Sequence, residues 1–318
     1  EEQENPLPAL VISPASLIYN WNAEFEKFAP SLRVEVINGT KEERSQLIEQ
    51  AEDVDVFVTS YPLIRQDINM YQQMEFSSLI LDEAQAIKNS ATKTAQAVKT
   101  IRAGIRFALS GTPIENSLQE LWSIFDAILP GFFPSKKAFT SLPEEQISRM
   151  SRPFILRRLK QDVLKELPDK IETVHVSELT KEQKQLYVGY LERIQGEAAD
   201  AIATEGFQKS RMKILAGLTR LRQLCCHPSL FIENYYGESG KLNQLLEMVE
   251  NALENKQRIL IFSQFASMLK MIREVLQQNG IDPFYLDVQT PSIARVDMAN
   301  RFNNGEKDIF LISLKAGG

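Results

Sequence analysis

Short apolar runs alternate with amphipathic segments along the first third of the chain. A continuous apolar run is typical of a strand buried on both faces of a parallel sheet, and apolar residues spaced three and four apart indicate a helix. Strands are predicted at residues 8–13, 34–37, 54–60, 78–82 and 105–110, and helices at 16–28, 41–51 and 90–101. Strands that alternate with helices predict an α/β fold with a parallel sheet.

The pattern changes after residues 110–113 and later returns. Helical spacing dominates up to residue 227, and strand signals reappear beyond it. The predicted elements are helices at 116–129, 144–167, 181–227 and 241–253, a strand at 258–264, a helix ending at Asn279, and strands within 283–287 and 308–318. We therefore expect two α/β lobes with helical insertions between them, divided as 1–113, 114–235 and 236–318.

Two adjacent carboxylates, Asp82 and Glu83, end the apolar run at residues 79–81. In parallel α/β sheets, ligands bind beyond the carboxyl ends of the strands. The pair is therefore placed for a nucleotide site, where Asp82 would hold Mg²⁺ and Glu83 would draw a proton from an attacking water. The alternative is that the two acidic residues only begin the next helix, whose amino end favours negative charge.

Composition describes an ordinary globular protein, with 43% hydrophobic and 25% charged residues among 318. The apolar runs are far too short to span a membrane, and the acidic first residues are unlike a signal peptide. We expect an intracellular protein without a membrane partner. The net charge of −6 excludes a general attraction to nucleic acid, so any such binding needs local basic patches.

Basic residues do cluster in the helical middle of the chain, in two stretches that contain no acidic residue. A DNA-binding patch and an ordinary solvated helical face are both compatible with such clusters. The first contains Arg149, Arg152, Arg157, Arg158 and Lys160, and the second Lys209, Arg211, Lys213, Arg220 and Arg222.

The only cysteines are Cys225 and Cys226, which are followed by His227. Adjacent cysteines cannot easily pair with each other, and no second ligand pair with zinc spacing is present. Both are predicted to be buried and reduced.

Six further blocks occur in order along the chain: DEAQ at 82–85, LSGTPIENSLQELWSIFDAILPGFF at 109–133, RPFILRRLKQDVLKELPDK at 152–170, LRQLCCHPSLF at 221–231, SGKL at 239–242 and ILIFSQF at 259–265. Together they resemble the Swi/Snf-type ATPase family of double-stranded DNA translocases, and they cover nearly the whole chain. The resemblance implies two RecA-like lobes that close on ATP and grip one duplex. The implied cofactors are ATP and Mg²⁺.

The resemblance also implies roles for residues around the nucleotide. Asp82 matches the carboxylate associated with Mg²⁺, through water, and Glu83 the base that orients the attacking water. Gln85, where many relatives have His, is expected to hydrogen-bond between this site and the coupling segment Ser110, Gly111 and Thr112. Gly317 and Gly318, in the last motif, are expected at the bound ATP.

Several hydroxyl and amide positions match motifs that approach DNA in the family or lie at the interface between lobes. Small hydroxyl groups suit phosphate oxygens and do not read bases, as movement along arbitrary sequence requires. A strand-end cap is the alternative for each of them. The positions are Ser13, Pro14, Ser60, Tyr61, Ser263, Gln264, Thr290 and Ser313, with Arg220 and Arg222 from the second basic cluster.

The chain departs from the family pattern in several places. The phosphate-binding loop GxxxxGK[ST] is absent, since the only Gly-Lys pair is Gly240-Lys241 followed by Leu242, and the later motif with the arginine finger is missing. Residues 133–152 look shortened, and Val288 stands where relatives usually have Gly. We expect a fragment of a larger enzyme that shows no DNA-stimulated ATPase activity by itself.

Two classes of function remain open. The first is an ATP-hydrolysing motor on duplex DNA that remodels complexes with DNA-bound proteins, located in the bacterial cytoplasm at the nucleoid or in a eukaryotic nucleus. The second is a nucleic-acid-binding scaffold or regulatory module that keeps the fold without hydrolysing ATP. The Asp82-Glu83 pair favours the motor for the parent protein, and a phosphate loop upstream of Glu1 would distinguish the two.

Overall fold

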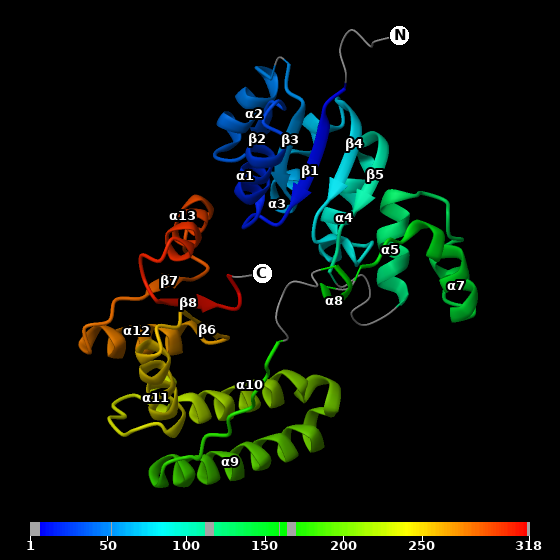
Figure 1. Ribbon diagram of the computed structural model, residues 1–318. Helices are drawn as coiled ribbons and strands as arrows, with labels where there is room; N and C mark the ends of the chain where they lie inside the picture. The colour runs from blue at the N-terminus through cyan, green and yellow to red at the C-terminus, as the bar shows by residue number, and fades with distance from the viewer. Residues whose placement is uncertain (1–6, 52, 112–117, 159, 164–169, 317–318) are drawn as a thin grey trace. The chain divides into compact units, whose positions relative to one another are not determined.

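The computed structural model describes residues 7–51, 53–111, 118–158, 160–163 and 170–316 of the chain. The chain divides into two compact units, Glu1–Asp169 and Lys170–Gly318, each with its own sheet (Figure 1). Among the described residues, no helix is both long enough and apolar enough to cross a membrane.

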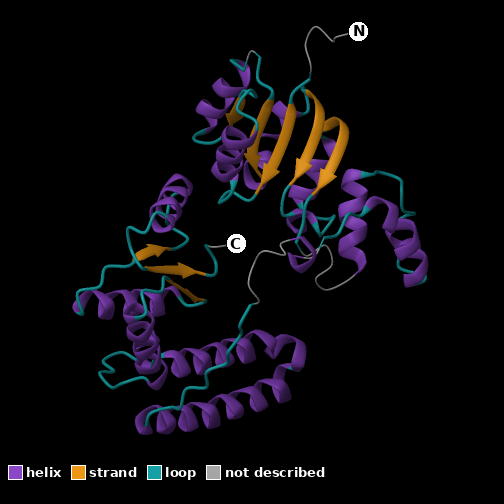
Figure 2. Cartoon of the chain, in the orientation of Figure 1, coloured by secondary structure: helices purple, strands orange, loops and turns teal. Residues whose placement is uncertain are grey.

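The first unit contains a five-stranded parallel sheet in the order β2-β3-β1-β4-β5, whose strands all point the same way (Figure 2). The α/β prediction is confirmed. Two strands begin earlier than their apolar runs, because backbone pairing continues through polar residues such as Glu75, which lies opposite Arg102. The strands are β1 (Ala9–Ser13), β2 (Val34–Val36), β3 (Val56–Ser60), β4 (Glu75–Leu81) and β5 (Arg102–Ala108).

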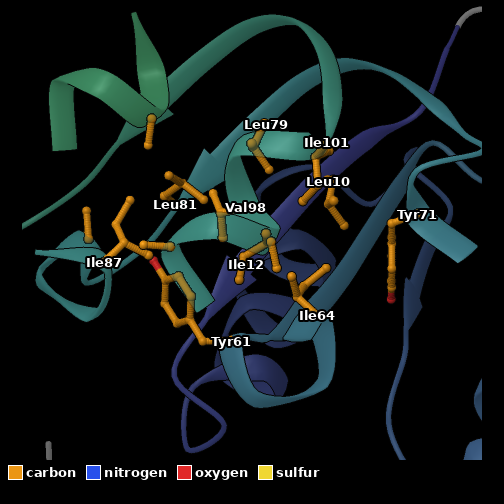
Figure 3. Packing of buried hydrophobic residues seen from close by; sticks show 14 of the residues in the cluster. Leu10, Ile12, Tyr61, Ile64, Tyr71, Leu79, Leu81, Ile87, Val98 and Ile101 are labelled. Atoms are coloured by element: carbon orange, nitrogen blue, oxygen red, sulfur yellow. The ribbon is translucent and has the colours of Figure 1, made fainter. Parts of the chain in front are cut away.

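Helices cover both faces of this sheet. On one face, α1 (Ile18–Phe28) packs against Val11, Val56 and Val58. On the other, α3 (Tyr61–Tyr71) and α4 (Lys93–Thr100) pack over Leu10, Ile12, Leu79 and Leu81, and Figure 3 shows this core. The helix α2 (Lys41–Glu49) begins at a capping box, in which Thr40 and Glu43 each accept a backbone N–H of the other. The helix α3 was not predicted, although its apolar residues Ile64, Ile68 and Tyr71 have helical spacing, because that short repeat is interrupted by the buried Asp67.

The rest of the first unit is helical, with α5 (Leu118–Ile128), α6 (Lys136–Phe139), α7 (Glu144–Ser151) and α8 (Lys160–Val163). The prediction of one helix over residues 144–167 is wrong. A short 3-10 turn at Arg152–Phe154 follows α7, and residues 155–158 have no helical structure. The reason is Pro153, which lacks the N–H that a continuing helix needs. Residues 164–167 lie outside the described part of the chain.

The second unit begins with two long antiparallel helices, α9 (Lys181–Glu205) and α10 (Phe207–Cys226), which meet at Gly206. The predicted helical region at 181–227 is therefore confirmed, with a break where Gly206 has a φ of 76° that favours glycine.

A three-stranded parallel sheet follows in the order β6-β8-β7. The remaining elements are α11 (Gly240–Glu254), β6 (Ile259–Ser263), α12 (Ala266–Gln278), β7 (Phe284–Leu286), α13 (Ser292–Asn303), which was not predicted, and β8 (Ile309–Ser313).

A buried glutamine, Gln183, connects three helices of this unit. Its side-chain nitrogen donates to the carbonyl of Leu224 at the end of α10 (3.2 Å), and its side-chain oxygen accepts the backbone N–H of Gly240 at the start of α11 (3.0 Å). The same oxygen caps α9 by accepting the N–H of Thr180 (3.2 Å). Since each bond is buried with the amide, loss of one partner would leave another polar group unsatisfied.

The two cysteines at the end of α10 are free and half-buried, less enclosed than predicted. Cys226 packs at the edge of the second unit's core. Burial raises the pKa of the Cys225 thiol, which keeps it in the unreactive protonated form.

A buried ion pair joins α2 to α3 in the first unit. Arg44 donates from Nε and Nη2 to the two carboxylate oxygens of Asp67, at 2.6 and 2.8 Å, and from Nη1 to the carbonyl of Gly39 at 2.6 Å. The side chains are only 5% and 1% exposed. The hydrogen bond with Asp67 raises the pKa of Arg44, so the guanidinium stays charged, and the buried carboxylate of Asp67 balances that charge.

Replacement of Asp67 by Asn should destabilise the first unit by about 3 to 5 kcal/mol, because it leaves a buried positive charge without its counterion. Urea unfolding followed by tryptophan fluorescence measures this, since Trp21 and Trp122 are the only tryptophans and both lie in the first unit. Asp53→Asn is the matched control, because its ion pair with Arg33 is exposed. Equal effects of the two substitutions would show that the buried pair is not needed.

Candidate functional site

Three neighbouring strands of the first sheet end at one edge. Ser13 at the end of β1 lies opposite Ser60 at the end of β3, and Ile12 lies opposite Leu81 at the end of β4. The chain then continues into Pro14, Tyr61 and Asp82, respectively. Residues far apart in the sequence therefore meet where parallel α/β sheets bind ligands.

All four polar groups of Asp82 are hydrogen-bonded. The carboxylate oxygen Oδ2 accepts the indole Nε1–H of Trp21 in α1 (2.9 Å), and Oδ1 accepts the backbone N–H of Glu83 (2.9 Å). The backbone N–H donates to the carbonyl of Ile12 (2.8 Å), and the backbone carbonyl accepts the hydroxyl of Tyr61 (2.7 Å). Contacts from α1, β1 and the start of α3 thus fix the position and the rotation of this carboxylate.

Trp21 and Tyr61 both contact Asp82, which the sequence did not predict. Trp21 belongs to the α1 core as predicted by its spacing, but its N–H reaches the acidic pair, which no local pattern reveals. Tyr61, predicted to face DNA, is buried in the core that Figure 3 shows. Its hydroxyl donates to the backbone carbonyl of Asp82. Burial raises the pKa of Tyr61, and the charges of Asp82 and Glu83 raise it further, so the hydroxyl remains a donor.

Glu83 has left-handed backbone geometry, with φ 48° and ψ 54°. This conformation is unfavourable for a residue with a side chain, and it persists only where surrounding contacts hold it, frequently at functional sites. Backbone hydrogen bonds flank the turn, from Ala84 N–H to the carbonyl of Leu109 (2.9 Å) and from Leu109 N–H to the carbonyl of Leu81 (2.8 Å). The acidic pair therefore forms a shaped turn between β4 and the segment after β5, and Glu83 also stands immediately before a short 3-10 helix, Ala84–Ile87, without capping it through its side chain.

Gln85 connects Glu83 to the segment after β5. Its amide nitrogen donates to the carboxylate of Glu83, and its amide oxygen accepts the hydroxyl of Ser110 (2.9 Å). The chain Glu83-Gln85-Ser110 has the connectivity expected for Gln85 from the sequence. Gly111 follows Ser110, while Thr112 lies outside the described residues.

The site offers one carboxylate suited to a magnesium ion, that of Asp82, since Mg²⁺ prefers hard oxygen ligands. Among the described residues, no group of three or more His, Cys, Asp or Glu side chains gathers around a possible metal position. Asp82 fits an ion that is mainly coordinated by water and by phosphate oxygens, which is how Mg²⁺ usually binds with nucleotides. Gly317 and Gly318, the other residues predicted at the nucleotide, lie outside the described residues.

The hydroxyl groups predicted to contact DNA are mostly turned inward. Ser13, Ser60 and Ser313 are buried at strand ends, and the Ser13 hydroxyl donates to the carbonyl of Pro14 (3.3 Å). Ser263 is half-buried and accepts the N–H of Phe265 (3.1 Å). These contacts match strand-end caps, so the side chains themselves add no support for a DNA role.

In the second unit, the structure brings Arg222 and Gln264 together. Arg222 donates from Nη2 to the side-chain oxygen of Gln264 (2.6 Å), and its guanidinium lies 5.9 Å from the ring centre of Phe265. Arg220 is also exposed, but it projects from another side of α10, beside Glu197 of α9. The second basic cluster is therefore divided between different sides of one helix.

Thr290 lies in a tight turn after β7, where its hydroxyl accepts the N–H of Asp287 (3.1 Å). Arg295 in α13, which the sequence interpretation missed, donates to the carbonyls of Thr290 (2.9 Å) and Ala316 (2.7 Å). This arginine joins two predicted motif segments, and only the folded chain shows that its side chain reaches both. Val288 in the same turn is exposed.

Replacement of Asp82 by Ala should move the indole N–H signal of Trp21 to lower frequency in a ¹⁵N–¹H spectrum and speed its exchange with water, because the carboxylate acceptor is lost. Trp122 is the internal control, since its indole N–H donates to the carbonyl of Pro134 (2.9 Å), remote from Asp82 in sequence. Trp122→Phe assigns the two signals. An unmoved Trp21 signal would contradict the hydrogen bond, and equal changes in both signals would indicate general unfolding.

Comparison with known proteins finds relatives that align with almost the full chain. An uncharacterized ATP-dependent helicase of Mycoplasma pneumoniae is 37% identical over 98% of this chain and 30% of its own length. The SWI/SNF-related matrix-associated actin-dependent regulator of chromatin subfamily A member 1 of Mus musculus is 33% identical over 98% of this chain and 32% of its own length. The chain spans about a third of the length of these curated relatives.

Among solved structures, the Sulfolobus solfataricus SWI2/SNF2 ATPase core in complex with double-stranded DNA is 34% identical, with a TM-score of 0.49, over 96% of this chain and 67% of that chain. The model of the helicase conserved C-terminal domain matches residues 240–318. The model of the SNF2-related domain matches residues 1–230, most of the chain. The chain therefore belongs to the SNF2-related family of helicase-like proteins.

Proposed function

We propose that this chain is the ATPase core of a motor that translocates on double-stranded DNA and remodels complexes of DNA with bound proteins. The observation that supports it best is the hydrogen-bonded network of Asp82, Glu83, Gln85 and Ser110 at the carboxyl edge of the first sheet. The family adds support, since its members include ATP-dependent helicases and a regulator of chromatin.

In this proposal, Asp82 would hold Mg²⁺ through water, with its carboxylate oriented by Trp21. The ion, when bound with ATP, neutralises charge on the phosphates. Glu83 would accept a proton from the water that attacks the terminal phosphate. Because Gln85 donates to the same carboxylate and an amide does not take up a proton near neutral pH, it would orient Glu83 and not compete as a base.

The same network provides a route from the nucleotide to the rest of the protein. A change in the position of the Glu83 carboxylate on hydrolysis would alter its bond with Gln85 and, through it, the bond with Ser110. Ser110 follows β5, so the strand and the segment after it would respond to the state of the nucleotide. Coupling of this kind needs two arrangements of the network, and Glu83→Gln changes one of its members.

Glu83→Gln, made in the full-length protein, should leave ATP binding intact and lower ATP hydrolysis by roughly two to four orders of magnitude, because the shape is kept and the base is removed. ATP binding and phosphate release are measured separately. Glu75→Gln at the opposite end of β4 is the control, since Glu75 is exposed and remote from the strand's carboxyl end. Near-normal turnover in Glu83→Gln would remove Glu83 from the catalytic role.

Duplex DNA should stimulate the full-length ATPase more than single-stranded DNA of equal nucleotide content. Arg220→Ala with Arg222→Ala should weaken duplex binding similarly for unrelated sequences and reduce its dependence on salt, because phosphate contacts release counterions and do not read bases. Filter binding at several salt concentrations measures the affinity for duplex DNA and its dependence on salt.

Arg193→Ala with Arg301→Ala is the matched control for that pair. It makes the same change in charge within the second unit, at arginines that are already paired with acidic residues. Equal losses of duplex affinity in both double variants would show that the effect comes from net charge alone. Stronger stimulation by single strands would contradict the duplex proposal.

A further inference from the structure

The helix α10 has apolar side chains on its buried face and along an exposed flank. Its inner face packs on α9 through the buried residues Ser210, Gly217, Leu221 and Leu224. The approach is close, since a Cβ added to Gly217 would lie 2.6 Å from a methyl group of Ile194 in α9. The packing of the helical hairpin therefore fixes which side of α10 is turned away from α9.

A flank beside this face is exposed and yet carries apolar residues. Met212, Leu215 and Leu218 are 74%, 47% and 50% exposed, and Phe207 at the helix start is 60% exposed. Residues 211, 215, 218 and 222 follow a spacing of four, three and four, which aligns side chains along one helix face. We call this face the outer stripe of α10, formed by Phe207, Arg211, Leu215, Leu218 and Arg222.

This apolar surface is more than the hairpin needs. One buried face is enough to pack α10 on α9, and a surface helix ordinarily places polar residues opposite its core face. An exposed row of apolar side chains from Phe207 to Leu218, roughly 17 Å long at about 1.5 Å per residue and divided only by Arg211, is instead typical of a protein-binding site.

The charge around the outer stripe has one sign. The helix contains five Lys and Arg residues and no Asp or Glu. Arg211 and Arg222 lie on the stripe itself, and both are exposed. Lys213 is on another side and forms an ion pair with Glu205 (2.7 Å). A partner on the stripe would therefore need apolar side chains for the centre and an acidic group for Arg211, while Arg222 remains bonded to Gln264 at the end of the stripe.

We propose that the outer stripe of α10 binds an amphipathic helix of a partner protein, with apolar residues at heptad spacing flanked by Asp and Glu. A helix fits better than DNA, because phosphates do not need exposed Met, Leu and Phe side chains. Nothing in this argument depends on ATP hydrolysis, so the proposal stands apart from the proposed function. The stripe ends at Arg222, which holds Gln264, so a bound helix would lie beside a residue predicted to approach DNA.

The test uses the whole 318-residue chain and a fluorescein-labelled helical peptide of about 18 residues, with Leu at the two core heptad positions and Glu beside them. A second peptide of identical composition has its Leu residues distributed around all faces. Fluorescence anisotropy should show that the first peptide binds at least about tenfold more tightly. Leu215→Ser with Leu218→Ser should lower the affinity for the first peptide at least about tenfold, as expected for residues at the centre of an interface.

Leu260→Ser with Leu314→Ser is the matched control, because both leucines are similarly exposed in the same unit but lie outside α10. This variant should bind the peptide as the unchanged chain does. Arg211→Ser should weaken binding, and more so at low salt.

Four results would overturn the proposal. They are equal binding of the two peptides, no effect of the α10 leucines, loss of duplex DNA binding instead of peptide binding in the α10 variant, and self-association through the stripe in sedimentation. A fall in melting temperature for Leu215→Ser would also overturn it, because the stripe would then already be covered within the chain.

Discussion

The position of one carboxylate, that of Asp82, depends on contacts from three separate parts of the first unit. Its backbone continues the pairing of β4 with β1, its carbonyl is held by Tyr61 at the start of α3, and its side chain is held by Trp21 in α1. The two faces of the sheet must therefore both be covered correctly before this group has one orientation. The geometry of the proposed site is therefore a property of the whole unit, as expected for a preorganised site.

The turn that follows Asp82 concentrates backbone strain where the chemistry is proposed. Glu83 adopts left-handed geometry between two buried elements, and the backbone bonds of Ala84 and Leu109 hold it there. A strained residue of this kind is stable only because the sheet beneath it is rigid. The contact from Gln85 to Ser110 then connects the strained turn to the end of β5.

Buried polar groups specify the arrangement of helices in both units. Arg44 and Asp67 join α2 to α3, and Gln183 joins the ends of α9, α10 and α11. Apolar packing alone permits helices to slide or rotate, whereas a buried amide or ion pair is satisfied in few arrangements. The outer stripe of α10 differs, because its apolar side chains have no such partner among the described contacts and remain exposed.

The sequence by itself determined the α/β class, most strands and the identity of the acidic pair, because these depend on local hydrophobic periodicity and on a motif of adjacent residues. It failed where the pattern was weak or interrupted. The apolar repeat of α3 is short and interrupted by the buried Asp67, α13 has no clear apolar repeat, and Pro153 ends a helix that was predicted to continue. Only the tertiary structure decided that Trp21 orients Asp82, that Tyr61 is buried and that Arg295 joins two loops. The physical reason is that a hydrogen bond between residues far apart in the chain depends on how strands and helices are placed in space, and no local spacing of residues encodes that placement.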